Sequence, residues 1–430
     1  MLFRQFVDDD LGCASYLVGD EEAGEALVVD PAYAIEPYLA AAAAAGVRIV
    51  RVLETHTHAD HVSGHGRLAL EHGIPVAIHP LAEPEFPFEP LADGQELRVG
   101  SLVVRVLHTP GHRPEHCSFL VPGRLVLTGD SLFVGDAARP DLAVEAREGA
   151  EGLFRSLRRL AALGDGVAVY PGHVAGSLCG GSMSSEPRST IGAERGANPM
   201  LAIGELQRFV AVSAAISAPR PPTVERCVAL NRGPFLGAPP ALARLDAPGE
   251  ATLLDVRPLD AFFAGHLPGA ISVPVAGSSF ATKAAFVLDP DERVVLHASS
   301  DDEAELAARR LRAAGLVDDL AGYLVEPAGA TERLEPVPVA ELERLVAADA
   351  VTVLDVREPD EFAAGHVPGA VNLPYRLARG GAPLDGKPVV TICESGPRAT
   401  VAASVLARAG ADARPVAAGG MNAWRGSVER

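Results

Sequence analysis

The chain has 430 residues, 48% of them hydrophobic and 22% charged, which suits about three globular domains and excludes a disordered chain. Its 37 Lys and Arg residues against 56 Asp and Glu residues give a formal net charge of −19. Nucleic-acid binding requires a basic surface, so we expect no nucleic-acid partner for so acidic a chain.

The N-terminus and the cysteines indicate a reducing compartment. The first residues lack the charged start, apolar stretch and cleavage site of a signal peptide, and no apolar run reaches the length of about 18 residues that predicts a membrane span. The five cysteines are too few, and odd in number, for a disulfide framework, and none forms a CxxC pair. We therefore expect free thiols, a cytoplasmic location and no membrane partner.

Seven potential metal ligands follow predicted strands in the N-terminal part of the chain. They are His56, His58, Asp60, His61, His112, Asp130 and His173. The first four fall within six positions after the apolar run VRIVRVL, a density that packing alone does not require. Side chains at the carboxyl ends of strands can converge from distant segments. Imidazole and carboxylate groups together suit zinc, iron or manganese better than calcium.

This ligand pattern, with the CASYLV strand and the VVDPA turn near Asp30, resembles the metallo-β-lactamase superfamily from Leu2 to about Asn198. The resemblance implies an α/β fold in which an αββα sandwich carries the metal at the edge between two sheets. Because this superfamily contains hydrolases and oxidoreductases, the fold alone assigns no activity.

Two subfamilies share the ligand pattern. Glyoxalase II enzymes use all seven ligands to hold two metal ions, here two zinc ions, for thioester hydrolysis. Persulfide dioxygenases keep these residues but hold one ferrous ion through the positions of His56, His112 and Asp130. The resemblance then leaves four residues for a second site or a supporting role: His58, Asp60, His61 and His173.

Two further segments resemble the dioxygenases rather than glyoxalase II. They are DSLFVGDAARPDL, which begins at Asp130, and the Gly- and Ser-rich segment after His173. The second segment contains Cys179, for which the resemblance implies a sulfur-relay role; an inert position in a loop is the alternative. Ala175 departs from the animal dioxygenases, which carry a tyrosine there.

The C-terminal part contains an internal duplication. LLDVRPLDAFFAGHLPGAISVPV begins at Leu253, and VLDVREPDEFAAGHVPGAVNLPY begins at Val353. Each copy alternates predicted strands and helices, which indicates a parallel sheet with helices on both faces. With Pro-rich seams after Ala218 and near Glu335, the pattern predicts three domains, 1–235, 236–335 and 336–430.

In the second copy a predicted strand ends at Cys393, and a helix follows almost at once. Backbone N–H groups and the helix N-terminus both favour a thiolate there, which makes Cys393 a candidate nucleophile. The loop CESGPR, with the DVR and GHxPGA segments, resembles rhodanese sulfurtransferases, and the resemblance extends the site to Arg398. In the first copy Ala298 and Glu303 take these two positions, so we expect that copy to be inactive.

The chain thus resembles a fusion of a persulfide dioxygenase with one inactive and one active rhodanese domain. The implied activity is oxidation of a low-molecular-weight thiol persulfide by dioxygen to sulfite, with sulfane sulfur passing through Cys393 to or from thiosulfate. We expect one Fe(2+) per chain, and a homo-oligomer is left open. Two alternatives remain: a dinuclear zinc thioester hydrolase with a sulfur-carrier tail, and a sulfur-carrier or sensing module with a degenerate metal domain.

Overall fold

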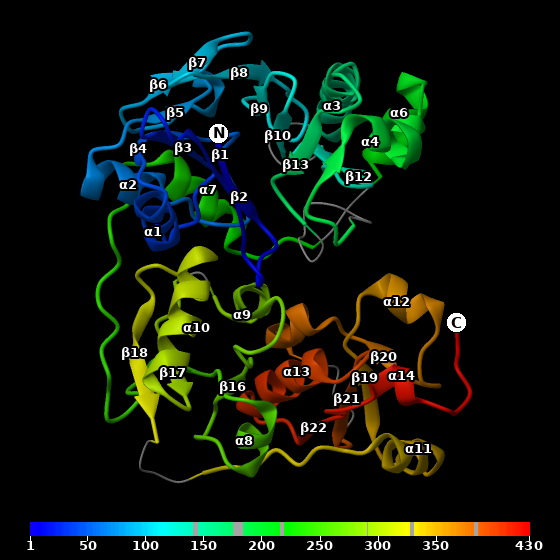
Figure 1. The fold of residues 1–430 in the computed structure, drawn as a ribbon. Helices are drawn as coiled ribbons and strands as arrows, with labels where there is room; N and C mark the ends of the chain where they lie inside the picture. Colours follow the sequence, from blue (N-terminus) through cyan, green and yellow to red (C-terminus); the bar gives the residue numbers. More distant parts are fainter. Residues whose placement is uncertain (141–144, 175–183, 216–218, 290, 327–330, 382–385) are drawn as a thin grey trace. The chain divides into compact units, whose positions relative to one another are not determined.

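The computed structural model describes the chain except residues 141–144, 175–183, 216–218, 290, 327–330 and 382–385 (Figure 1). The chain divides into two compact units, Met1–Pro239 with Arg312–Gly315, and the remainder of Pro240–Arg430. The finer division into domains 1–235, 236–335 and 336–430 stays a prediction. Within the described ranges, no helix is both long and apolar enough to cross a membrane.

Two six-stranded sheets form the centre of the first unit. The first sheet, in the order β1-β2-β3-β4-β5-β6, consists of β1 (Leu2–Val7), β2 (Ala14–Asp20), β3 (Glu25–Val29), β4 (Arg48–Leu53), β5 (Val76–Ile78) and β6 (Glu89–Pro90). The second sheet, in the order β14-β13-β10-β9-β8-β7, consists of β7 (Glu96–Val99), β8 (Leu102–His108), β9 (Cys117–Val121), β10 (Leu125–Gly129), β13 (Ala168–Pro171) and β14 (Ser189–Thr190). Strands β11 (Leu132–Phe133) and β12 (Asp136–Ala137) form a separate antiparallel pair.

The helices of the first unit cover the outer faces of the two sheets. They are α1 (Glu36–Ala44), α2 (His65–His72), α3 (Ala146–Ala161), α4 (Ile191–Ala197), α5 (Pro199–Ala202), α6 (Leu206–Ser213) and α7 (Val224–Arg232), with a short 3-10 helix at Pro80–Ala82. Helix α3 is amphipathic: Leu153, Leu157 and Leu160 lie on its buried stripe, whereas Arg155 is exposed.

Side-chain alternation along the strands produces the layers. In β2, every residue is buried, because Tyr16 and Val18 enter the core between the sheets while Leu17 enters the core beneath the helices that include α1. A third core joins the second sheet to α3. The order is therefore helix, sheet, sheet, helix, and the predicted αββα sandwich is confirmed.

The second unit contains two four-stranded parallel sheets with the same topology. The first copy orders its strands β16-β15-β17-β18, with β15 (Thr252–Asp255), β16 (Ile271–Ser272), β17 (Val294–Ala298) and β18 (Leu320–Val325). The second copy orders them β20-β19-β21-β22, with β19 (Thr352–Asp355), β20 (Val371–Asn372), β21 (Val389–Ile392) and β22 (Ala413–Pro415). All their pairings are parallel, as predicted.

The helices of the second unit follow the duplication only in part. They are α8 (Leu259–Ala264), α9 (Phe280–Val287) and α10 (Asp301–Ala313) in the first copy, and α11 (Val339–Ala347), α12 (Pro359–Ala364), the 3-10 helix η2 (Tyr375–Gly380), α13 (Pro397–Arg408) and α14 (Gly420–Ala423) in the second. The copies contact each other: α13 packs against β16, and the backbone N–H of Ser272 donates to Ser404 Oγ at 3.0 Å.

Candidate metal centre and cysteine loop

Three predicted ligands converge at one edge of the sandwich. His56 follows β4, His112 lies between β8 and β9, and Asp130 follows β10. Each is only 1% exposed, and one ligand atom from each lies within 4.8 Å of the other two. The strands that precede them belong to different sheets, so the trio forms only when the two sheets pack. This buried group of two histidines and one aspartate has the composition of a metal site.

Hydrogen bonds set the tautomers of both histidines. The Thr55 hydroxyl donates its one proton to Asp30 Oδ2 at 2.9 Å and therefore accepts from His56 Nδ1 at 2.8 Å. His112 Nδ1 donates to the carbonyl of Arg139 at 2.8 Å. In both rings this leaves the Nε2 lone pair available as a ligand, with an outer partner that fixes the orientation of the ring.

The electrostatics of the trio also suit a cation. Burial and the neighbouring His58 and His112 lower the pKa of His56 well below its ordinary value, so its imidazole is neutral. Burial likewise lowers the pKa of His112. Asp130 Oδ2 lies 3.6 Å from His112 Nε2 and has no hydrogen-bond partner among the described residues. A buried carboxylate oxygen facing two imidazoles fits a metal ion, so the residues present fit the implied cofactor.

The four other predicted ligands lie beside the trio. His58, Asp60 and His61 form a second group whose ligand atoms lie within 4.8 Å of one another. His173 lies between two carboxylates: its Nδ1 is 2.7 Å from Asp130 Oδ1 and its Nε2 is 2.6 Å from Asp60 Oδ2. Burial lowers the pKa of His173, but Asp130 and Asp60 outweigh it and raise the pKa to about 10. Both ring nitrogens therefore act as donors.

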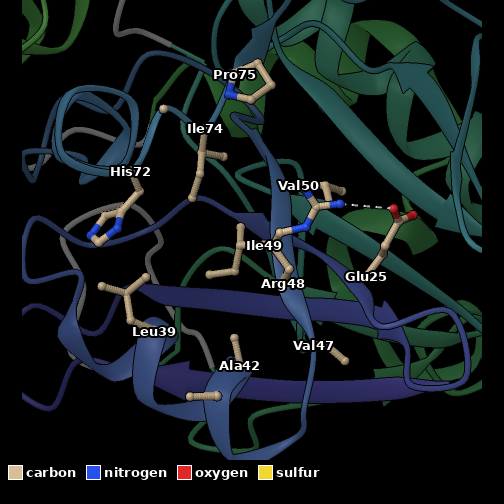
Figure 2. A pocket seen from close by; sticks show the side chains of 12 residues that line it. Glu25, Leu39, Ala42, Val47, Arg48, Ile49, Val50, His72, Ile74 and Pro75 are labelled. Carbon is tan, nitrogen blue, oxygen red and sulfur yellow. Dashed lines mark ion pairs between the residues drawn. The ribbon is translucent and has the colours of Figure 1, made fainter.

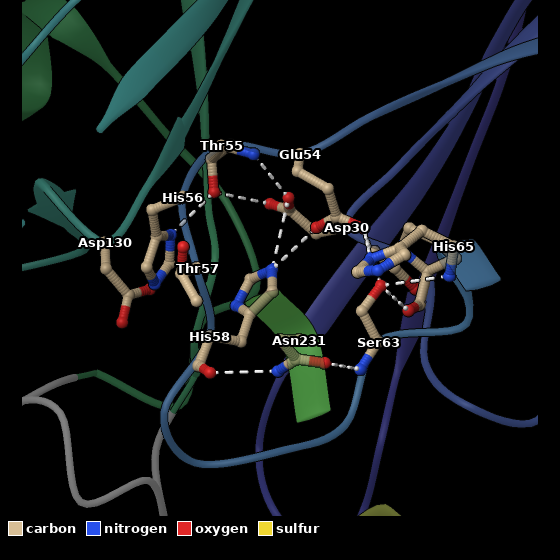
Figure 3. A network of polar contacts seen from close by, with 12 residues as sticks. Asp30, Glu54, Thr55, His56, Thr57, His58, Ser63, His65, Asp130 and Asn231 are labelled. Carbon is tan, nitrogen blue, oxygen red and sulfur yellow. Dashed lines mark hydrogen bonds and ion pairs between the residues drawn. The ribbon is translucent and has the colours of Figure 1, made fainter. Parts of the chain in front are cut away.

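A buried polar network supports the ligand loop (Figure 3). His58 Nε2 lies 3.1 Å from Glu54 Oε2 and 3.3 Å from Asp30 Oδ1, whereas its Nδ1 has no partner among the described residues. Glu54 Oε1 also accepts from the hydroxyl of Ser63 at 2.5 Å and lies 3.1 Å from His65 Nδ1. The network orients the His58 ring so that its Nδ1 faces the other predicted ligands. This nitrogen is thereby a further candidate metal ligand.

Sequence reasoning did not assign roles to Glu54 or Asn231. Asn231, on α7, donates to the carbonyl of His58 at 2.9 Å and accepts from the N–H of Ser63 at 2.8 Å (Figure 3). It also donates to the carbonyl of His61 at 2.8 Å. These bonds fix the backbone of the ligand loop. The separation of about 170 residues leaves no local signal for Asn231, whereas Glu54 stands directly after a buried strand, where an acidic residue could have been noticed.

A surface pocket of the first unit has no part in this site. It is lined by residues of α1, β4 and the α2–β5 turn, including Leu39, Ile49 and His72, with an ion pair of 3.5 Å between Arg48 and Glu25 (Figure 2). None of the predicted metal ligands lines it.

The predicted cysteine loop lies between β21 and α13. Cys393 directly follows β21, is 1% exposed, and its Sγ accepts from the backbone N–H of Gly396 at 3.1 Å. Gly396 has φ 129°, and a Cβ there would lie 2.0 Å from the carbonyl oxygen of Ala417. The tight turn that aims this N–H at the sulfur therefore requires glycine.

Arg398 does not stand free beside the thiol. Its two terminal nitrogens each lie 2.7 Å from an oxygen of Glu361, and Glu394 Oε2 lies 3.9 Å away. Partial burial raises the pKa of Glu361, but the hydrogen bonds from Arg398 outweigh it and hold the pKa below its ordinary value. The Arg398 guanidinium is thus already paired with Glu361 in a bidentate bond.

Sheet register fixes the equivalence of the two copies. Asp355 pairs with Ile392 in the second copy, and Asp255 pairs with His297 in the first. The next residues, Cys393 and Ala298, therefore occupy equivalent positions. His297, for which a structural role is predicted, is buried with its Nδ1 3.1 Å from Asp255 Oδ2.

The remaining cysteines divide into two groups. Cys13, Cys117 and Cys227 are free and buried, as is Cys393, so the expectation of free thiols holds for the described cysteines. Burial raises the pKa of Cys117 to about 12, which makes it a poor nucleophile. Cys179 and Ala175 lie outside the described residues.

Comparison with known proteins identifies both parts of the chain. The family model of the metallo-β-lactamase superfamily matches residues 8–173, and the model of the rhodanese-like domain matches residues 238–324 and 338–427. The chain therefore carries a metallo-β-lactamase domain followed by two rhodanese-like domains.

Individual relatives show which members of the metallo-β-lactamase superfamily the first part of the chain is similar to. The mitochondrial persulfide dioxygenase ETHE1 of Bos taurus is 28% identical over 245 residues, which are 56% of this chain and 91% of that protein. A hydroxyacylglutathione hydrolase of Alkalilimnicola ehrlichii is 37% identical over 169 residues, 37% of this chain and 60% of that protein. A solved metallo-β-lactamase structure from Staphylococcus aureus has a TM-score of 0.70 at 29% identity, covering 76% of this chain and 99% of that one. The metallo-β-lactamase domain is thus related both to ETHE1 and to glyoxalase II.

Proposed function

We propose that the N-terminal domain is a non-haem iron dioxygenase acting on low-molecular-weight thiol persulfides. The observation that carries the proposal is the buried trio of His56, His112 and Asp130, with one carboxylate oxygen unpaired among the described residues. These three residues would hold one ferrous ion. When bound, it supplies open coordination positions for a persulfide sulfur and for dioxygen. Overall, persulfide, dioxygen and water yield thiol and sulfite.

The chain's own residues orient the ligands. Thr55 and the carbonyl of Arg139 hold the two imidazoles, and His173 holds Oδ1 of Asp130, which leaves Oδ2 for the metal.

We propose that the second rhodanese copy is active and transfers sulfane sulfur through Cys393, with Arg398 in its site and with sulfite or thiosulfate as partners. The Cys393 thiolate would attack the outer sulfur of a persulfide and release the thiol, and sulfite would then take that sulfur as thiosulfate. The first copy is inactive in this proposal, because Ala298 lacks a nucleophile and the Glu303 carboxylate accepts from the loop N–H of Ser299 at 2.5 Å.

Iron content and oxygen uptake test the first activity. Protein reconstituted with ferrous iron should bind about one iron per chain and consume oxygen with glutathione persulfide. His112→Ala should lower the rate of oxygen uptake by at least about 100-fold, because even the loss of a residue that only supports a metal ligand lowers metal affinity or activity 10- to 100-fold. The exposed His72 provides the matched control, and His72→Ala should keep wild-type uptake. Thioester hydrolysis without oxygen uptake would overturn the proposal.

The alternative is a dinuclear zinc thioester hydrolase of the glyoxalase II type, with the rhodanese tail as a sulfur carrier. The second group of His58, Asp60 and His61 and the hydroxyacylglutathione hydrolase relatives favour it. Metal analysis separates the two proposals: two zinc ions per chain with rapid hydrolysis of a glutathione thioester support the hydrolase.

Further parts of the proposal rest on the sequence. We propose three domains with boundaries at 235/236 and 335/336, and a cytoplasmic location. Whether the protein forms a homo-oligomer is left open. For Cys179 we propose a sulfur relay near the metal. Cys179→Ser with unchanged persulfide turnover would remove this residue from the mechanism.

A further inference from the structure

Comparing the two copies distinguishes ion pairs that the fold requires from ion pairs that occur only together with the thiol. Both copies keep the buried pair of the DVR segment: Asp255 and Arg257 approach to 2.6 Å, and so do Asp355 and Arg357. Since the first copy has no thiol, this pair is needed by the fold whether or not the loop is reactive.

The pair between Glu361 and Arg398 behaves differently. By the offsets of the two copies, Glu361 corresponds to Ala261 and Arg398 to Glu303, so the copy without a thiol lacks both partners. The first copy nevertheless forms the same sheet, with α8 and α10 at the positions of α12 and α13. The Glu361–Arg398 pair is therefore dispensable for the fold and occurs together with Cys393.

The geometry of this pair cancels the positive charge beside the thiol. Both terminal nitrogens of Arg398 are occupied by Glu361, whose Oε2 also accepts from the N–H of Glu358 at 3.0 Å in the capping box of α12. The carboxylate is thus held from two sides. Glu394 adds a second negative charge 3.9 Å from the guanidinium, so the three side chains together carry a net charge of −1.

Sulfur donors differ in the charge they bring to such a loop. Loading from thiosulfate breaks its S–S bond, forms a bond between Cys393 Sγ and the outer sulfur, and releases sulfite with the bonding electron pair. A thiolate and a dianion carry three negative charges into that step. A protonated thiol persulfide reacts in the same way, with the thiolate as leaving group, and contributes no charge at its reacting sulfurs. An uncancelled arginine would favour thiosulfate more than the persulfide.

We propose that Glu361 is a specificity-determining residue that cancels the charge of Arg398 and thereby selects thiol persulfides over thiosulfate as sulfur donors to Cys393. The inference rests on the proposed role of Cys393 as the sulfur-accepting nucleophile. It assigns the loading direction: sulfur enters Cys393 from a persulfide, and thiosulfate is a poor donor.

The test compares Glu361→Gln with Asp360→Asn in the full-length protein. Asp360 is the exposed neighbour of Glu361 at the start of α12, so this control removes one charge without touching Arg398. Loading of Cys393 is followed by mass spectrometry, as addition of one sulfur atom, with thiosulfate and with glutathione persulfide at low ionic strength. Glu361→Gln should raise the ratio of the thiosulfate rate to the persulfide rate by about tenfold, and Asp360→Asn should leave it unchanged.

The wild-type protein supplies a measurement that does not depend on a variant's folding. Added salt should accelerate loading from thiosulfate, because screening weakens the repulsion, and should affect the persulfide rate less. An unchanged donor ratio in folded Glu361→Gln, or salt-independent loading from thiosulfate, would overturn the role of Glu361. Absence of Cys393 loading with either donor would instead overturn the sulfurtransferase proposal itself.

Discussion

The two rhodanese-like copies share a scaffold and differ in the loop that follows the central strand. In each, four parallel strands adopt the same order, a buried aspartate binds the arginine two residues later, and a phenylalanine ring stacks on a histidine four residues on. The stacked centroids lie 3.9 Å apart for Phe262 and His266 and 3.6 Å apart for Phe362 and His366. The scaffold is therefore retained where the thiol is absent, which indicates that it does not depend on the chemistry of the loop.

The two loops differ in the group that accepts a hydrogen bond from the loop backbone. In the second copy the N–H of Gly396 donates to the sulfur of Cys393. In the first copy the chain fills its own loop, because the carboxylate of Glu303 accepts from the N–H of Ser299. A backbone cradle for an anion thus serves a side chain in one copy and a reactive group in the other.

The largest effect that the comparison predicts is that of Cys393→Ser. The first copy offers no second nucleophile, so sulfur transfer should fall by at least about 1,000-fold, the scale of losing a catalytic nucleophile. Oxygen uptake by the metal domain should persist. Thiosulfate formation from persulfide and sulfite measures the first quantity, and an oxygen electrode the second. Substantial transfer in this variant would mean that another thiol carries the sulfur.

The shared aspartates should matter equally to both copies. Asp255→Ala and Asp355→Ala each leave a largely buried arginine without its partner, so each should lower the free energy of unfolding by about 3 kcal/mol. Urea unfolding followed by circular dichroism measures both, and fluorescence of Trp424, the single tryptophan, reports on the second copy. Asp260→Ala, at an exposed position, should change stability by no more than about 0.5 kcal/mol. A large loss in only one copy would contradict the shared role.

The smallest effect should come from restoring the missing thiol. Ala298→Cys places a thiol at the equivalent of Cys393, but the loop N–H of Ser299 remains bound to Glu303. We expect loading at position 298 to stay at least about 100-fold slower than at Cys393, because an incorrectly oriented loop costs on that scale. Peptide mapping after exposure to persulfide distinguishes the two sites. Equal loading would show that the thiol alone defines the active copy.

Local patterns were sufficient to predict much of this molecule. Strand-end clusters predicted His56, His112 and Asp130 as neighbours, and the repeat of DVR and GHxPGA predicted two similar parallel-sheet domains. The network behind the ligands was not predictable, because Asn231 reaches the carbonyls of His58 and His61 from a helix about 170 residues further along the chain. The bidentate pair of Arg398 with Glu361 was missed for the same reason: its partners lie 37 residues apart on different helices.

The sequence by itself determined the order of the domains, the identity of the ligand-type side chains and the loss of the thiol at Ala298, because these follow from residue type and spacing. Only the tertiary structure decided which of those side chains face one another, and with what charge. It paired His173 with two carboxylates, left Asp130 Oδ2 open toward His112, and cancelled the charge of Arg398 with Glu361. Distances between groups far apart in the chain depend on how the sheets and helices pack, and electrostatic interactions depend on those distances.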